Sequence, residues 1–340
     1  MQGRLLQRAH IRIGPNCSVS CVALSADGQY LAVGTLPIAG GVLQEHLGPA
    51  DRPCPVAGAM QGLRLYDRTG QCLLSYPGDG TELPVSLIAM TPDMHWLFLA
   101  TREGELYGME AAKWLSGTKP ELRLLHRTPA DLNSLSVSAD GSLIALGHLS
   151  PALTVLQTDG HVVWRRHRDT GNATRGHIWS TALDAAGTSM SVGSAGAEHV
   201  TLAIMDPQTG ALCAGHSMDA PVVHLAPPLN SAIVAAPFVG SYEYRLVGYS
   251  LDLRSELWRR TFEEPICALV AGPQNDRVFV CVGHEGRIMA WDEQGRETAE
   301  EIRLNVQIKC LAVAASNDLV AGTHDGYIYW LTYETGTTDL

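Results

Sequence analysis

The chain has 340 residues, 46% of them hydrophobic and 17% charged, and its formal net charge at pH 7 is −11. We expect one all-β domain over residues 1–340, because a chain of this length does not require two domains. The acidic balance argues against binding to nucleic acids or anionic membranes through general charge, since phosphate groups require a positive surface. The first residues lack the apolar core of a signal peptide, and no run has the length of a membrane span. We therefore expect a cytoplasmic protein without a membrane partner.

The eight cysteines show neither a C-x-x-C pair nor a zinc-binding spacing. Several of them, such as Cys21, Cys267, Cys281 and Cys310, lie within apolar runs, where a free thiol acts as a small hydrophobic residue. We expect no metal and no cofactor.

Seven similar units follow one another along the chain. In each unit an apolar run ends before a turn, and the apolar residues at these ends are Leu24, Met90, Val137, Leu183, Leu225, Leu269 and Val313. Successive members of this series are 66, 47, 46, 42, 44 and 44 residues apart. All but the first spacing fit the period of about 40–45 residues expected for four-stranded propeller blades. An insertion at residues 36–61 explains the length of the first unit.

Aspartate-glycine pairs mark the turns after the first strands. Asp27-Gly28 in the first unit corresponds to Asp140-Gly141 in the third unit, each just after an apolar run. Glycine tolerates the positive φ of such turns, so these pairs predict hairpins.

The sixth unit shows the strand pattern most clearly. Its three runs, Ile266–Val270, Val278–Val282 and Arg287–Trp291, are short and rich in β-formers. They are apolar almost throughout, which predicts a small sheet with both faces buried.

The two ends of the chain complete the last unit. The seventh unit supplies three strands, the last at Tyr327–Leu331, and the chain then ends. Gly3–Gln7 resembles Gly70–Leu74, the fourth strand of the first unit. We therefore expect a strand at residues 3–12 to pair with the last blade, which removes an exposed sheet edge. The predicted fold is an all-β, seven-bladed β-propeller closed by its N-terminal strand.

Short motifs carry a family resemblance. The dipeptides at the ends of third strands are Trp291-Asp292, Tyr66-Asp67 and Met205-Asp206. The turns between second and third strands include His284-Glu285-Gly286 and His324-Asp325-Gly326. These motifs resemble those of WD-repeat propellers over nearly the whole chain. The Thr-Gly turns followed by outer strands with Trp164 and Trp258 are also similar to quinoprotein-like propellers, which share this geometry.

The longest irregular segments are expected on one face of the ring. In a propeller, connections from second to third strands share a face with connections between blades. Residues 36–61, 194–199 and 237–244 and the linker 165–177 fall there. Long loops are usually functional or disordered, and arginine and aromatic side chains often anchor interfaces. The predicted partner-binding residues are His46, Arg52, Arg166, Arg168, Arg175, Phe238, Tyr242 and Tyr244.

Two hypotheses of different class follow. The first is a non-enzymatic protein-interaction platform, an adaptor or scaffold subunit of a larger assembly. It is favoured because the chain has no G-x-S-x-G motif and no glycine-rich phosphate loop. The alternative is a propeller enzyme or small-molecule sensor, similar to a hydrolase or lactonase, with groups at a central channel.

Two weaker options concern single features. His148, His284 and His324 follow second strands, and three histidines near one axis can bind a metal, although a turn-capping role is simpler. We expect no recognition of nucleic acid except through a partner or through the basic loop Arg165–Arg175.

Overall fold

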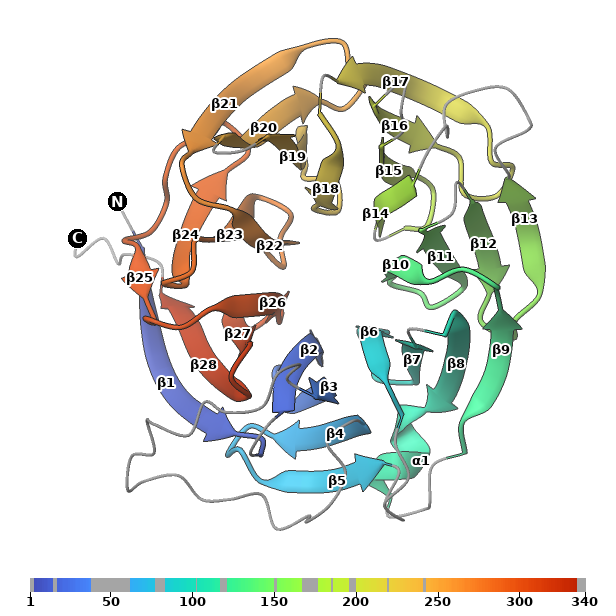
Figure 1. The fold of residues 1–340 in the computed structure, drawn as a ribbon, viewed down its shortest axis with the longest axis vertical. Helices are drawn as coiled ribbons and strands as arrows, with labels where there is room; N and C mark the ends of the chain where they lie inside the picture. Colours follow the sequence, from blue (N-terminus) through green and yellow to red (C-terminus); the bar gives the residue numbers. More distant parts are fainter. Residues whose placement is uncertain are drawn as a thin grey trace.

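In the computed structural model, seven four-stranded antiparallel sheets are arranged as blades around a common axis (Figure 1). The structure describes residues 3–14, 17–37, 62–76, 83–101, 103–116, 121–149, 152–166, 177–184, 186–195, 200–218, 220–240 and 243–334. The predicted seven-bladed propeller is therefore confirmed.

The first four blades are numbered in chain order, and the strands of each run from the axis outward. Blade 1 contains β2 (Cys17–Leu24), β3 (Tyr30–Pro37), β4 (Gly62–Asp67) and β5 (Cys72–Tyr76). Blade 2 contains β6 (Val85–Met90), β7 (Trp96–Thr101), β8 (Glu105–Glu110) and β9 (Arg123–Arg127), with helix α1 (Ala111–Leu115) between the last two. Blade 3 contains β10 (Leu132–Val137), β11 (Leu143–His148), β12 (Leu153–Gln157) and β13 (Val162–Arg166). Blade 4 contains β14 (His177–Leu183), β15 (Met190–Ala195), β16 (Val200–Met205) and β17 (Leu212–Met218).

The last three blades follow the same plan, except that the final outer strand comes from the N-terminus. Blade 5 contains β18 (Val222–Leu225), β19 (Ala232–Gly240), β20 (Glu243–Ser250) and β21 (Glu256–Phe262). Blade 6 contains β22 (Ile266–Ala271), β23 (Arg277–Val282), β24 (Arg287–Asp292) and the short β25 (Ile302–Arg303). Blade 7 contains β26 (Ile308–Val313), β27 (Asp318–Thr323), β28 (Tyr327–Glu334) and β1 (Arg4–Arg12).

The N-terminal strand closes the ring as predicted. Strand β1 pairs antiparallel with β28 from Arg4–Glu334 to Arg12–Tyr327, with one irregularity in register (Figure 1). Leu5 on this strand is buried. The residue before this strand also contacts blade 6, because the amide of Gly3 donates to the Thr298 carbonyl over 2.6 Å.

The apolar core is divided among the junctions between blades rather than among the blades. The described residues form seven clusters of buried side chains, and each cluster combines side chains of two neighbouring blades. A blade therefore buries its faces only when both neighbours are in place, which is the usual logic of repeat folds. It also explains why strands such as β23 and β27 are buried on both faces.

Close backbone approach at the second strands brings adjacent blades together. A Cβ added to Gly34 of β3 would lie 2.9 Å from Val85 Cγ1 of blade 2. One added to Gly322 of β27 would lie 3.0 Å from Val19 Cβ of blade 1. Similar contacts recur from blade 3 to blade 4 and from blade 4 to blade 5. Glycine is required at these places by space and not by backbone angle.

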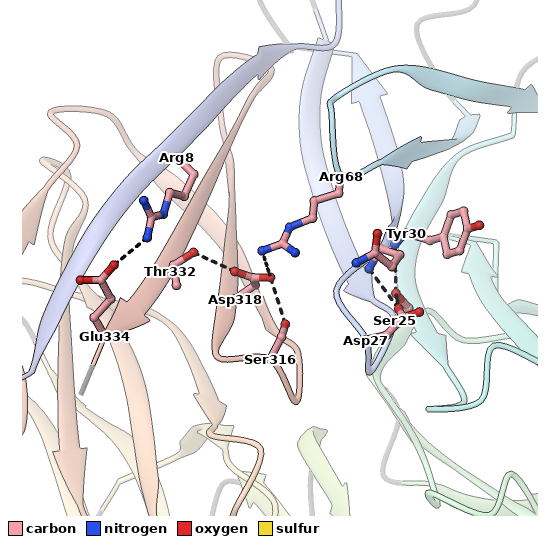
Figure 2. A network of polar contacts seen from close by, with 10 residues as sticks. Arg8, Ser25, Asp27, Tyr30, Arg68, Ser316, Asp318, Thr332 and Glu334 are labelled. Atoms are coloured by element: carbon pink, nitrogen blue, oxygen red, sulfur yellow. Dashed lines mark hydrogen bonds and ion pairs between the residues drawn. The ribbon is translucent and has the colours of Figure 1, made fainter. Parts of the chain in front are cut away.

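A buried carboxylate joins blade 7 to blade 1 (Figure 2). The side chain of Asp318 is only 1% exposed, and Arg68 of blade 1 lies 3.0 Å from it. Ser316 and Thr332 donate hydroxyl hydrogen bonds to the same carboxylate over 2.9 and 2.7 Å. The charge is therefore paired and hydrogen-bonded, as a buried ion requires.

The predicted hairpins are formed through hydroxyl-aspartate pairs. The Ser25 hydroxyl donates to Asp27 Oδ1 over 2.5 Å and accepts from the Tyr30 amide over 2.9 Å (Figure 2). Gly28 has a φ of +68° and Gly141 one of +70°, which confirms that both aspartate-glycine pairs form turns with positive φ.

Candidate functional site

The connections of the ring fall on two opposite faces. Because every blade is antiparallel, the links from second to third strands and from one blade to the next lie together, on what we call the loop face. The turns from first to second and from third to fourth strands lie on the other side, the turn face. The predicted insertion at 36–61 begins within β3, and its residues 38–61 lie outside the described residues.

Three of the eight predicted partner-binding residues are in the described part of the chain. They are Arg166, Phe238 and Tyr244. The other five lie outside the described residues and are His46, Arg52, Arg168, Arg175 and Tyr242.

Phe238 and Tyr244 form an aromatic pair on the loop face of blade 5. They are cross-strand partners in β19 and β20, and their ring centroids are 5.3 Å apart at an interplanar angle of 40°. Phe238 is 39% exposed, and no other aromatic side chain of the described residues is as accessible. Aromatic rings that bury area at low entropic cost are frequent interface anchors.

Phe262 extends this pair into an aromatic platform, defined here as Phe238, Tyr244 and Phe262. Tyr244 is the cross-strand partner of Phe262 at the end of β21. Both side chains pack against the hydrophobic cluster between blades 5 and 6. Phe238 is therefore presented on a fixed base and not on a free loop.

A charge network adjoins the platform on blade 6 and comprises Glu264, Glu285, Arg287, Glu301 and Arg303. Arg287 Nη2 lies 2.7 Å from Glu264 Oε2, and Arg287 Nη1 lies 3.7 Å from Glu301. Arg303 lies 2.5 Å from Glu301 and 3.7 Å from Glu285. The pKa of Arg303 is raised by its hydrogen bond to Glu301 and by the neighbouring carboxylates. Three acids and two bases leave one net negative charge on an ordered polar surface.

Sequence reasoning missed both Phe262 and this network. Phe262 directly precedes Glu263-Glu264 at the end of an outer strand, and this acidic pair is the one sign of the junction in the sequence. One of its ion pairs joins Glu264, in the connection after β21, to Arg287 at the start of β24, 23 positions later in the chain. No local pattern reports such a pairing.

Arg166 is not part of the aromatic platform, since it lies in blade 3. It ends β13, and its Nε would be 3.3 Å from a Cβ placed on Gly210 in the β16–β17 turn. Its neighbour Trp164 donates from Nε1 to the Pro207 carbonyl of the same turn over 2.7 Å. Arg166 thus packs at the junction of blades 3 and 4, while the adjacent Arg165 is exposed.

The same junction recurs two blades later. Trp258 of β21 donates to the Glu293 carbonyl over 2.8 Å, and the guanidinium of Arg260 lies 5.1 Å from the ring centroid of Trp291. A tryptophan followed two residues later by arginine therefore joins an outer strand to the next blade in both places. The outer-strand tryptophans serve packing between blades.

The inner strands offer few groups for chemistry. They carry no aspartate or glutamate, and Lys309 is their one lysine or arginine. His224 of β18 is held neutral, because burial lowers its pKa to about 4. Among the described residues, no three or more of His, Cys, Asp and Glu are grouped closely enough to hold a metal ion.

The three histidines that follow second strands make local contacts. His148 is fully buried and lies 3.3 Å from the Thr128 hydroxyl and 3.0 Å from the Thr154 hydroxyl. His284 Nδ1 lies 3.4 Å from the side-chain amide of Gln307, and the amide of His324 donates to the Gln307 carbonyl over 2.9 Å. These partners serve to fix the connections of the loop face.

Two further observations concern the class of protein. In the described part of the chain, no helix combines the length and the apolar character needed to cross a membrane. The model of the family "WD domain, G-beta repeat" matches residues 6–36, and no curated protein matches the chain. The matched segment covers most of β1 together with β2 and almost all of β3, so it crosses the closure from blade 7 into blade 1. With the seven blades, this match supports a WD-repeat propeller, a class that generally serves as a protein-interaction platform and is typically non-enzymatic.

Proposed function

We propose that this WD-repeat propeller is a non-enzymatic adaptor or scaffold subunit that binds a protein partner through its loop face. The observation that carries the proposal is Phe238, an exposed aromatic side chain packed beside the partly buried ring of Tyr244. The charge network next to it gives the surface a polar rim. An apolar centre with a polar rim is the usual anatomy of a protein interface.

The physical argument concerns preorganisation. Binding costs free energy when side chains become ordered, and this cost is low for a ring that is already packed against Tyr244. The charges of the network are held in place by their ion pairs, so they favour a partner whose charges are complementary to them and disfavour a partner that brings like charges together. The sequence candidates His46, Arg52, Arg168, Arg175 and Tyr242 remain part of the proposed face on the grounds given by the sequence.

The inner strands support a platform over the alternative of an enzyme or sensor at the axis. Such chemistry requires carboxylates, histidines or a bound ion that converge there. These strands provide His177, His224 and Lys309 and no carboxylate. Elemental analysis of the purified chain addresses the alternative directly, because a stoichiometric metal ion would favour it.

Affinity purification from the native source with matched variants tests the proposal. The tagged chain is expected to retain a partner that Phe238→Ala loses, with binding weakened by about 2 kcal/mol or about thirtyfold for an interface anchor. Leu257→Ala is the control, since Leu257 is 49% exposed on the outer strand of the same blade, away from the platform. A chain that stays without a partner under gentle conditions, or equal losses for both variants, would contradict the proposal.

A further inference from the structure

A second surface lies on the turn face between blades 1 and 2. A hollow of about 390 Å³ is lined there by the apolar side chains of Tyr30, Met94 and Leu115, by Ala112, and by the carboxylates of Asp27 and Asp93. Among the residues that the structure describes, no lysine, arginine or histidine lines it. The hollow is far from the aromatic platform, which belongs to blade 5 on the opposite face.

Met94 forms the floor of the hollow at a backbone position where other blades carry different residues. Its φ is +57°, in the left-handed region that side chains other than glycine and asparagine seldom adopt. In blades 1, 3, 4, 6 and 7 the corresponding turns place there Gly28, Gly141, Gly187, Asn275 and Asn317. A methionine in this conformation costs about 1 kcal/mol, so blade 2 accepts strain to keep an apolar side chain at this point.

Helix α1 supplies one wall of the hollow, and it is special to blade 2. Elsewhere in the described chain the third strand passes to the fourth without a helix. Ala111 and Trp114 are 2% and 1% exposed and fix the helix in the core between blades 1 and 2. Leu115 is 37% exposed beside them. A firmly anchored element thus presents an apolar side chain to solvent at the rim.

The two carboxylates are held in place by their turns. Asp27 Oδ1 accepts from the Ser25 hydroxyl over 2.5 Å (Figure 2). It also accepts from the Gln29 amide over 3.0 Å. Asp93 Oδ1 accepts in the same way from the hydroxyl of Thr91 and the amide of the second following residue, over 2.6 and 2.9 Å. Within the described residues, both Oδ2 atoms are left without a donor.

Both carboxylates carry their charge at neutral pH. The hydroxyl hydrogen bonds, followed by those from the backbone amides, lower the pKa of Asp27 and of Asp93 below the usual range. A ligand at this hollow therefore meets an apolar floor and wall beside two fixed negative charges.

We propose that this hollow binds a segment of a partner protein in which a large apolar side chain stands next to arginine or lysine. The apolar side chain would fill the space over Met94 and against Leu115, and the basic group would donate to the free carboxylate oxygens. Charge-assisted hydrogen bonds to carboxylates are strong and favour arginine in particular. The propeller then holds two partners on opposite faces, so this site stands independently of the loop face.

Selection from a library of displayed random peptides on the purified full chain tests the proposal. Enriched peptides are expected to combine an apolar residue with adjacent arginine or lysine. The double variant Asp27→Asn, Asp93→Asn keeps the Oδ1 acceptors of the turns and removes both charges. It should bind the selected peptide at least about tenfold more weakly in fluorescence polarisation.

Three further variants make the result specific. Met94→Asn removes the apolar floor with a residue that other blades accept at this φ, and it should weaken binding as well. Asp140→Asn alters the same kind of turn in blade 3, where the Ser138 hydroxyl donates to Asp140 Oδ1 over 2.6 Å, and should bind normally. Phe238→Ala should also bind the peptide normally, which separates this site from the loop face. Absence of enrichment, enriched peptides without basic residues, or binding unchanged in the double variant would overturn the proposal.

Discussion

Replacement of Gly322 by alanine tests how the last blade meets the first. Gly322 lies in β27, and its φ is outside the left-handed region, so alanine adds no backbone strain. The new Cβ would lie 2.7 Å from Cys310 Sγ and 3.0 Å from Val19 Cβ, both closer than ordinary van der Waals contact. Blade 1 or blade 7 must therefore shift for the residue to fit.

The expected effect is a balance of two terms. Overpacking of a close interface costs about 1–3 kcal/mol. Alanine restricts the unfolded chain more than glycine does, which stabilises the fold by about 0.4–1 kcal/mol. The first term is larger, so we expect the free energy of unfolding to fall by about 1–2 kcal/mol.

Urea unfolding followed by tryptophan fluorescence measures this change. Gly215→Ala is the matched control, because a Cβ on this outer-strand glycine would meet only Leu212 atoms at 3.9 Å. The control should raise the unfolding midpoint slightly, whereas Gly322→Ala should lower it. Adding Val19→Ala removes the opposing side chain and should make the two changes non-additive. A Gly322→Ala protein as stable as the wild type would refute close approach as the basis of the junction.

Three other predictions concern charge and burial. Arg68→Met leaves the buried carboxylate of Asp318 without its cation and should lower the free energy of unfolding by about 1–3 kcal/mol in urea titrations. Arg254→Met is the control, because the Arg254 side chain is 86% exposed and pairs with Asp252 at the surface; it should change stability by less than about 0.5 kcal/mol. Burial lowers the pKa of His224 from 6.5 in the unfolded chain to about 4 in the folded protein, so between pH 6.5 and 4 the unfolded chain binds a proton that the folded protein does not. The free energy of unfolding should therefore fall as the pH decreases from 6.5 to 4. His224→Gln should make this fall smaller, and an unchanged pH dependence would count against the low pKa of His224. Iodoacetamide should modify the exposed Cys213 readily and spare Cys21, whose pKa is raised to about 12 by burial, and mass spectrometry showing equal modification would contradict this.

The proposed loop-face site shows which spatial relations sequence reasoning leaves to the tertiary structure. The sequence predicts Phe238 and Tyr244 as partner-binding residues because they are aromatic and lie in a connection from a second to a third strand, and the structure brings their rings together. Arg166 was grouped with them, yet it lies two blades away against the β16–β17 turn. The type of a residue indicates which interactions its side chain can make. The neighbours that the side chain meets depend on strand register and on the twist of the blade.

The hollow at Met94 makes the same point for the turn face. Of the two aspartates at its rim, Asp27 lies in a turn that the sequence marks by Asp27-Gly28, whereas Asp93 is followed by Met94. In blade 2 the glycine is replaced by methionine, which weakens the very signal that would mark the turn. Helix α1 lies beside this turn because Trp114 packs between blades 1 and 2. This contact joins elements that are distant in the chain, so a local sequence pattern does not predict it.

The amino-acid sequence alone predicts the seven units, the order and number of strands, and the use of residues 3–12 to complete the last blade. These features depend on apolar runs of fixed length and on turn residues, which act over a few positions and repeat. The aromatic platform, the charge network and the hollow depend on the tertiary structure, because their members come from separate strands and connections and, for the hollow, from two blades. Contacts of that kind depend on distances between elements remote in the chain, and these distances are set by strand pairing within a blade and by the packing of one blade against the next.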